Sequence, residues 1–401
     1  MSKNEKVNKV WSVYFPYLFV TCMLVANYLS GVKLVQLGIP HLGGVVCSVP
    51  EAKLNLLMAL MAVNACVVGI ISGFLLNKVS LQIKSRLFIL LGSFGIQGAI
   101  TFFANFLSEP FHFTIWIIVF SLVLGFLLCQ PFVFVFLLIP SKNRGILAGL
   151  ITGLAYLVGN MSMVEWTFKG LSLETIIVTI PLGILILIAL FNLDKLKLLD
   201  FNEEKEKTHY SDKRNIYSFG IIVVLMFGVY FVDSFGFLRL KGEPFFLLMW
   251  GGKFGVKIWL GIVHLISALI MGWIYQKRGK YGPMIVFISA FIGFIVGDLL
   301  FASYPSGSLL LVSSYIYCSA VSFYTINGFI LWADLSDKTN ISGRAGIGIG
   351  IGGWLSSFLS TALTEEIMNI IEFKYHLIIT ALLAGFFLVI SLFYYKKLRI
   401  S

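Results

Sequence analysis

The chain has 401 residues, of which 58% are hydrophobic and 12% are charged. Soluble globular proteins carry roughly 45–50% apolar and about 25% charged residues, so this composition excludes a water-soluble enzyme, a disordered protein and a disulfide scaffold. The net charge of +11 could indicate binding to nucleic acid. The basic residues, however, lie in short segments between apolar runs, which is typical of membrane topology.

Twelve apolar runs approach or exceed the length of about 20 helical residues that a bilayer core requires. Lipid offers no partner to an open strand edge, so the sequence predicts an all-α integral membrane protein with twelve transmembrane helices. In chain order the predicted spans are 11–29, 55–76, 87–107, 114–138, 145–164, 175–193, 216–236, 256–275, 283–301, 309–331, 345–363 and 375–395.

The distribution of Lys and Arg predicts the orientation of these spans. With the N-terminus inside, all but eight of the 30 basic residues fall in cytoplasmic segments. We therefore expect a multi-pass protein of the plasma (cell) membrane with both termini in the cytoplasm. This bias also explains most of the positive charge without any nucleic acid.

One long polar stretch interrupts the series of spans. Residues 194–215 mix acidic and basic side chains, a composition typical of a solvated linker. We expect a cytoplasmic linker there, between an N-terminal six-helix bundle at 1–193 and a C-terminal six-helix bundle at 216–401.

The two halves match each other at an offset of about 200 residues, which indicates an internal duplication. Arg144 and Arg344 each stand just before a glycine-rich span, and the glycines of 345–353 favour close helix packing over phosphate binding. The matching positions in the loops after spans two and eight are Gly73, Asn77 and Lys78 in the first copy, and Gly272, Gln276, Lys277, Gly279 and Lys280 in the second.

At these positions the sequence resembles the major facilitator superfamily, whose signature after span two reads Gly-x-x-x-Asp-Arg-x-Gly-Arg-Arg/Lys and recurs more weakly after span eight. The residues of the second copy that match this signature in type are Gly272, Lys277, Gly279 and Lys280. Asn77 and Gln276 stand at its acidic position. The resemblance implies two six-helix bundles around a central cavity, a substrate path along spans 1, 4, 7 and 10, and a cytoplasmic gate at these loops. The alternative is that the loop lysines only set topology.

Asp233 is the clearest ionisable residue inside a predicted span, where a charge costs roughly 2.5–3.5 kcal/mol on insertion scales. It is a candidate for carrying a coupling proton or contacting a cation. Alternatively, it pairs with Arg239 or caps a helix break before Gly236. Asp298 lies near the outer end of span nine, where solvation at the membrane interface is the simple explanation.

Other polar side chains in the spans are candidates for substrate contact, with helix packing as the alternative for each. They are Asn27, Gln130, Tyr317, Tyr324, Asn327 and His264. Gln130 precedes Pro131, which removes a backbone donor and frees a carbonyl group. Tyr317 and Tyr324 share one face of span ten, a pattern more typical of packing. His264 is a candidate proton shuttle, or it bonds a neighbouring helix.

These observations predict a secondary transporter that moves a small solute by alternating access, with a non-transporting sensor or scaffold as the alternative. The spans hold no convergent catalytic set and the chain no ATP-binding motif, so we do not expect an enzyme. We expect no cofactor and no metal. The expected partners are a small-molecule substrate, a proton or another coupling ion, and the lipid bilayer, for a monomeric chain. Few fixed charges line the predicted path, which favours a neutral, weakly polar or cationic substrate.

Overall fold

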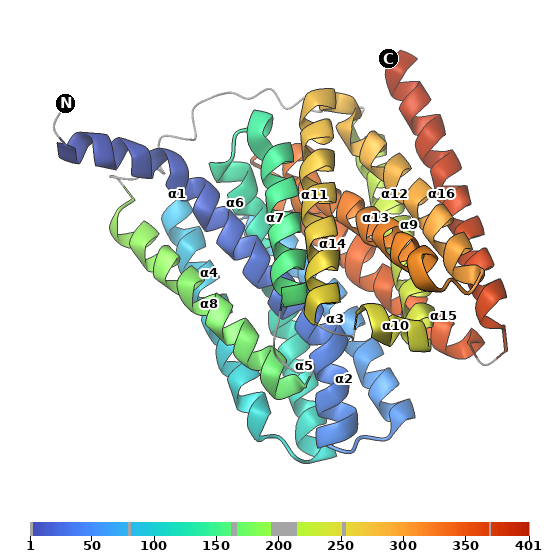
Figure 1. Cartoon of the computed structure of the whole chain (residues 1–401). Helices are drawn as coiled ribbons and strands as arrows, with labels where there is room; N and C mark the ends of the chain where they lie inside the picture. Colours follow the sequence, from blue (N-terminus) through green and yellow to red (C-terminus); the bar gives the residue numbers. More distant parts are fainter. Residues whose placement is uncertain are drawn as a thin grey trace. The chain divides into compact units, whose positions relative to one another are not determined.

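The structure is a computed structural model of the chain. It describes residues 3–78, 82–127, 129–161, 167–193, 215–250, 254–368 and 370–400. Within these ranges every regular element is a helix (Figure 1), which confirms the predicted all-α class. The predicted linker 194–215 lies outside the described residues except for its last residue, so the proposed boundary between two sequence halves stays a prediction.

The chain divides into two compact units that do not follow the order of the sequence. Unit 1 comprises Met1–Ser141, Val164–Ser211 and Trp332–Gly350, so it takes a short segment from late in the chain. Its helices are α1 (Lys3–Tyr28), α2 (Ile39–His41), α3 (Glu51–Asn77), α4 (Ile83–Phe103), α5 (Pro110–Leu127), α6 (Gln130–Leu138), α8 (Phe168–Phe191) and α14 (Ile341–Ile349).

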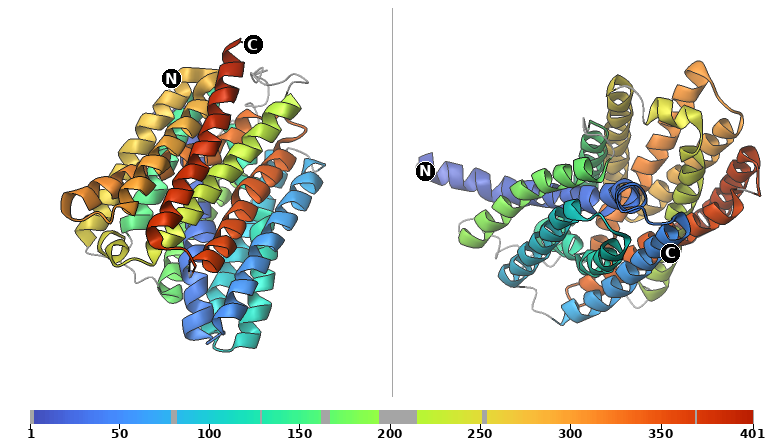
Figure 2. Two further views of the ribbon diagram at one scale, coloured as in Figure 1. Left: turned by 90° about the vertical axis from the view of Figure 1, so that its right-hand side faces the viewer. Right: turned by 90° about the horizontal axis from the view of Figure 1, so that it is seen from below.

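Unit 2 comprises Lys142–Met163, Asp212–Leu331 and Ile351–Ser401. Its helices are α7 (Ser141–Met161), α9 (Asn215–Lys241), α10 (Pro244–Met249), α11 (Phe254–Arg278), α12 (Gly282–Ala302), α13 (Gly307–Asp334), α15 (Ser356–Ile367) and α16 (Phe373–Ile400). Inside this unit α16, red in Figure 2, packs along α12. Each unit therefore combines most of one half of the sequence with a helix from the other half.

The helices have the length and hydropathy of membrane spans. Within the described ranges, ten stretches are long and apolar enough to cross a bilayer, and one of them, Val256–Ala302, contains both α11 and α12. Large apolar side chains such as Leu382, Phe386 and Phe393 of α16 are more than half exposed. Lipid accounts for such exposure, which would be an aggregation hazard in water.

One predicted segment differs from the structure. The sequence places a loop after residue 29, but the chain continues as helix to Val46, through π-helical turns at Leu29–Gly38 and Leu42–Val46. The predicted fourth span, 114–138, lies within one membrane-length stretch, Pro110–Leu138, in which α5 ends at Leu127 and α6 starts at Gln130. Pro131 stands in the first turn of α6, where its missing N–H is not needed.

The turn between α11 and α12 depends on a glycine of the family-like loop. Gly279 has φ of +51°, in the left-handed region that side chains with a Cβ rarely adopt. Pro283 then stands in the first turn of α12. The glycine at this position therefore sets the direction of the chain between two membrane helices.

Candidate functional site

The carboxyl group of Asp233 on α9 is held by two tyrosines of α13. The hydroxyl of Tyr317 lies 2.9 Å from Oδ1 of Asp233 and 3.0 Å from its backbone oxygen. The hydroxyl of Tyr324 donates a hydrogen bond to Oδ2. Both oxygens of the carboxyl group thus have a hydroxyl donor, while the residue itself remains partly exposed.

The spacing along α13 explains why both tyrosines reach one acid. Tyr317 and Tyr324 are two helical turns apart, so they lie on the same face of the helix. Both are buried, with 2% and 4% of their surface exposed. The ring of Tyr230, one turn before Asp233 on α9, packs edge-on against Tyr324 with 5.0 Å between centroids. The predicted tyrosine face of α13 therefore packs against α9 and also makes polar contacts with Asp233.

Asp298 on α12 brings a second carboxyl group to the same place. A Cβ atom built on Gly236 would lie 3.2 Å from Oδ1 of Asp298 and 3.7 Å from the Tyr317 hydroxyl. The Asp298 side chain is 0% exposed, and neither of its oxygens bonds any described residue. Solvation at the interface, as predicted from the position of Asp298 along its span, is wrong. Position along a span does not reveal which face of the helix a residue occupies.

The alternative explanations for Asp233 are also wrong. Arg239 pairs with Glu243, with 3.8 Å between Nη1 and Oε1, and its guanidinium lies 5.3 Å from the centroid of the Phe373 ring. Helix α9 continues past Gly236 to Lys241, so there is no helix break for Asp233 to cap. Among the described residues, neither Asp233 nor Asp298 has a cationic partner within ion-pair distance.

Two candidates of the N-terminal half lie in unit 1. Asn27 on α1 is partly exposed, and its side chain bonds no described residue. Gln130 at the start of α6 is 0% exposed, its Nε2 lies 3.9 Å from Sγ of Cys129, and its Oε1 has no partner among the described residues. Substrate contact by either residue stays a prediction.

His264 and Asn327 are engaged inside unit 2. Nδ1 of His264 lies 2.7 Å from the hydroxyl of Ser322 on α13, and its ring stacks on Tyr156 of α7 at 4.2 Å. Nδ2 of Asn327 donates to the backbone oxygen of Pro283 at 3.1 Å. These contacts favour packing between helices for both residues. The structure thus brings Asp233, Tyr317 and Tyr324 together and places the other candidates elsewhere.

The amides at the acidic position of the family-like loops bond backbone N–H groups of another helix. Oδ1 of Asn77, at the end of α3, accepts hydrogen bonds from the backbone N–H groups of Ser342 and Gly343 at 3.0 and 3.2 Å. Oε1 of Gln276, at the matching place in α11, accepts one from the backbone N–H of Gly145 at 2.9 Å. Ser342 and Gly343 stand in the first turn of α14, where N–H groups lack a partner within the helix, so Asn77 caps α14. Gly145 is the fifth residue of α7, so the bond from Gln276 joins two helices without capping the end of α7.

The motif glycines allow these helix ends to approach closely. A Cβ on Gly73 would lie 2.5 Å from the backbone oxygen of Ser342, and a Cβ on Gly272 would lie 2.5 Å from that of Gly145. Such distances are below contact, so only glycine fits. Gly346 and Gly149 make the same kind of approach from α14 and α7. The two loop copies therefore make equivalent contacts, which sequence comparison alone did not predict.

The basic residues around the loops differ in their surroundings. Arg86 on α4 is 0% exposed, and its Nη2 donates to the backbone oxygen of Leu76 at the end of α3 at 2.6 Å. Its Nη1 donates to the hydroxyl of Ser342 at 3.3 Å. Lys277 instead lies 4.7 Å from the ring of Trp273 on its own helix. Arg86 therefore belongs to the capped contact, whereas Lys277 stays on the surface of α11.

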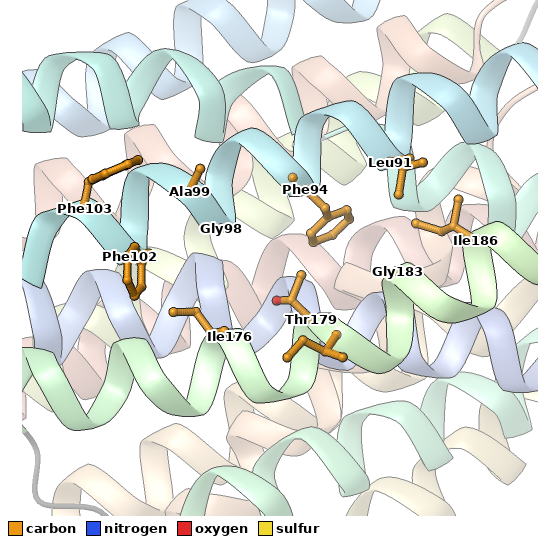
Figure 3. Close-up of a pocket in the computed structure, with 12 residues that line it drawn as sticks. Leu91, Phe94, Gly98, Ala99, Phe102, Phe103, Ile176, Thr179, Gly183 and Ile186 are labelled. Carbon is orange, nitrogen blue, oxygen red and sulfur yellow. The ribbon is translucent and has the colours of Figure 1, made fainter.

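A pocket of about 410 Å³ opens elsewhere, between α4 and α8 of unit 1 (Figure 3). Its lining is apolar except for Thr179, and Phe94 and Phe102 are among the side chains around it. A substrate site needs a few polar groups that fix orientation. This pocket lacks them and contains none of the candidate residues. No group of three or more His, Cys, Asp or Glu residues in the described chain could hold a metal ion.

Solved structures share this arrangement over nearly the whole chain. The proton:xylose symporter XylE, a major facilitator superfamily protein, is 15% identical, and 97% of this chain aligns with 96% of that chain at a TM-score of 0.66. The human organic anion transporter TETRAN is 11% identical, with 94% of this chain and 99% of that chain aligned at 0.67. A variant of the E. coli fucose:proton symporter FucP is 13% identical, with 95% and 99% aligned at 0.57.

The chain has the major facilitator superfamily fold. No protein-family model matches the sequence, and no curated protein matches it. The major facilitator fold and the apolar helices together make this a multi-pass membrane protein. At the acidic position of the family-like loops this chain has amides, and both bond backbone N–H groups of another helix.

Proposed function

We propose that this chain is a secondary active transporter that moves a small solute across the cell membrane by alternating access, coupled to protons through Asp233. The observation that carries the proposal is the Asp233 carboxyl group. It lies in a membrane helix, is partly exposed, and is bonded by two tyrosines without any cationic partner among the described residues. Ionisable groups placed in this way in a membrane mark substrate or proton paths.

The proposed substrate is a neutral or cationic small molecule with several hydroxyl or amino groups. Dianionic substrates such as phosphate esters favour paired arginines. The partly exposed candidates, Asn27 and Asp233, instead offer amide and carboxyl groups. XylE and FucP are named as proton symporters of xylose and fucose, which supports a polar uncharged solute by analogy of fold.

The proposed mechanism uses the two amide contacts of the family-like loops. The contacts of Asn77 with α14 and of Gln276 with α7 form when these helices meet and separate when the gate opens. We place both contacts and both termini on the cytoplasmic side, and propose that the halves 1–193 and 216–401 of a monomeric chain rock against each other. The distribution of basic residues supports this orientation.

The orientation is tested by labelling single cysteines in intact cells with a membrane-impermeant maleimide. Lys280→Cys should be protected until the cells are opened, whereas Glu109→Cys should react at once. The native cysteines do not interfere much, since four of the five are buried and Cys22 is only partly exposed. The reverse pattern would contradict the proposed orientation.

Transport is tested with the full chain reconstituted in lipid vesicles. A screen of sugars, nucleosides, amino acids and organic cations for a rise in melting temperature first identifies a ligand, because binding to the folded state alone stabilises it. Labelled ligand should then accumulate inside vesicles under an inward proton gradient. Accumulation should be lost in Asp233→Asn and kept in Glu109→Gln, the same change at a carboxyl group that is 66% exposed.

Two outcomes separate the parts of this proposal. Accumulation that is unchanged in Asp233→Asn would show a transporter whose coupling does not use this acid. Ligand binding without flux in any gradient would favour the alternative of a sensor or scaffold on the same fold.

A further inference from the structure

Asp298 carries a buried carboxyl group that has no hydrogen-bond partner among the described residues. It lies on α12, and 0% of its surface is exposed. An ionised carboxylate in such surroundings loses its hydration and gains nothing in return. Burial of this kind favours the neutral, protonated form of the group.

Four helices of unit 2 surround this position. A Cβ atom built on Gly236 of α9 would lie 3.2 Å from Oδ1 of Asp298, 3.3 Å from Cγ2 of Thr380 on α16, and 3.7 Å from the hydroxyl of Tyr317 on α13. That hydroxyl also bonds Asp233. The buried acid and the hydroxyl that bonds Asp233 therefore lie around the same point beside Gly236.

No cationic group of the described residues forms an ion pair with Asp298, although α9, α11 and α16 carry lysines and arginines toward their ends. Of the titratable groups on the helices packed against α12, Asp233 comes from α9, and Tyr317, Tyr324 and the buried Cys318 come from α13. On α16, Nε2 of His376 lies 3.0 Å from the backbone oxygen of Phe235. On α11, His264 bonds Ser322. Arg239 pairs with Glu243 at the end of α9, and Lys280 and Tyr281 lie at the opposite end of α12.

We propose that Asp298 is the proton-holding site of this protein, and that it exchanges its proton with Asp233 beside Tyr317. The proposal rests on the proposed transport function. In the exchange, a proton leaves the carboxyl group of Asp298 and arrives at the carboxylate of Asp233, so the negative charge moves in the opposite direction. No electron is transferred and no other group changes its charge.

A proton fits this site better than a metal cation does. A bound cation needs several oxygen ligands around it. No group of three or more His, Cys, Asp or Glu residues in the described chain could hold a metal ion, and the oxygens of Asp233 already accept bonds from the tyrosines. A single proton needs only one carboxyl oxygen.

Infrared spectroscopy of the full chain in lipid vesicles tests this site without any substrate. The carbonyl stretch of a protonated carboxyl group should be present at neutral pH and shift in heavy water. It should be absent in Asp298→Asn and retained in Glu109→Gln. In Asp233→Asn it should persist with an altered pH dependence. A neutral-pH band that is unchanged in folded Asp298→Asn would overturn the proposal.

Two further measurements keep the test decisive if the first variant does not fold or if the site binds a cation. If Asp298→Asn does not fold, Asp298→Glu should keep the band and change its frequency, and an unchanged frequency would count against Asp298. Loss of the wild-type band on addition of sodium would show a cation site and also overturn the proposal. Because the band needs no transport, it can be present even if flux is never found, so failure of the transport function and failure of this site are distinguishable.

Discussion

Asn77 on α3 and Gln276 on α11 hold matching places in the two loop copies. Asn77 accepts two hydrogen bonds from the first turn of α14, and Gln276 accepts one from Gly145 of α7. Their partner helices, α14 and α7, come from opposite halves of the sequence.

Removing the cap that Asn77 forms on α14 should destabilise the protein measurably. Asn77→Ala should lower the free energy of unfolding by about 1 kcal/mol, the usual value of a side-chain cap. The check is the melting temperature in detergent. Asn55→Ala on the same helix is the control and should have little effect; equal losses from both alanine variants would contradict the capping role.

Close backbone contact between α7 and α11 predicts a sharp difference between two glycines. A Cβ on Gly149 would lie 2.5 Å from the backbone oxygen of Ala268, whereas a Cβ on Gly92 meets nothing within 4 Å. Gly149→Ala should therefore cost about 1–3 kcal/mol through overpacking. Gly92→Ala should be neutral or stabilise the helix by up to about 1 kcal/mol. Thermal unfolding of both variants gives the answer, and equal melting temperatures would show that α7 can move away without cost.

The hydrogen bond from Tyr317 to Asp233 joins α13 to α9. Tyr317→Phe removes the hydroxyl and should cost roughly 1.5–3 kcal/mol, because the bond involves an ionisable acceptor. Tyr315→Phe on the same helix is the matched control, since its hydroxyl bonds no described residue. Melting temperatures of the two variants should differ clearly. A Tyr317→Phe protein as stable as Tyr315→Phe would argue against this bond.

The ion pair between Lys33 and Glu174 is another buried polar contact of unit 1. Nζ and Oε2 are 2.7 Å apart, and the side chains are 8% and 12% exposed. Glu174→Gln should cost about 3–5 kcal/mol, because it removes the carboxylate that pairs with a buried ammonium group. The double variant Lys33→Met/Glu174→Leu should recover most of that loss. The exposed pair of His112 and Glu109 is the control, and Glu109→Gln should cost about 0–1 kcal/mol.

Hydropathy and the positions of basic residues were enough to predict the membrane helices, because both follow directly from the cost of placing polar groups in lipid. The helical segment 30–46 was not predicted in this way. Lys33, Gly38 and Pro40 lower its hydropathy and predict a loop. In the structure the ammonium group of Lys33 pairs with Glu174 on α8, which offsets the cost of a lysine in this helix. Glu174 is 141 residues away in the sequence, so no local pattern reveals the pair.

The candidate site was predicted in part. Asp233 and the tyrosine face of α13 were visible from residue type and spacing. Their mutual contact was not, since it depends on how α9 and α13 pack. Asp298 was misjudged for the same reason: its depth along the span was read correctly as near the end, but its side chain faces Gly236 and not water.

The amides at the two loops make contacts that do not depend on pH, in contrast to the carboxyl groups of unit 2. Asparagine and glutamine have no titratable proton, so their hydrogen bonds to α14 and α7 keep the same strength as the acidity of the medium changes. A carboxylate in their place would accept hydrogen bonds less well once protonated. A drop in pH that protonates Asp233 therefore leaves both amide contacts unaltered, and we expect the proposed gate to respond to it only through movement of the helices.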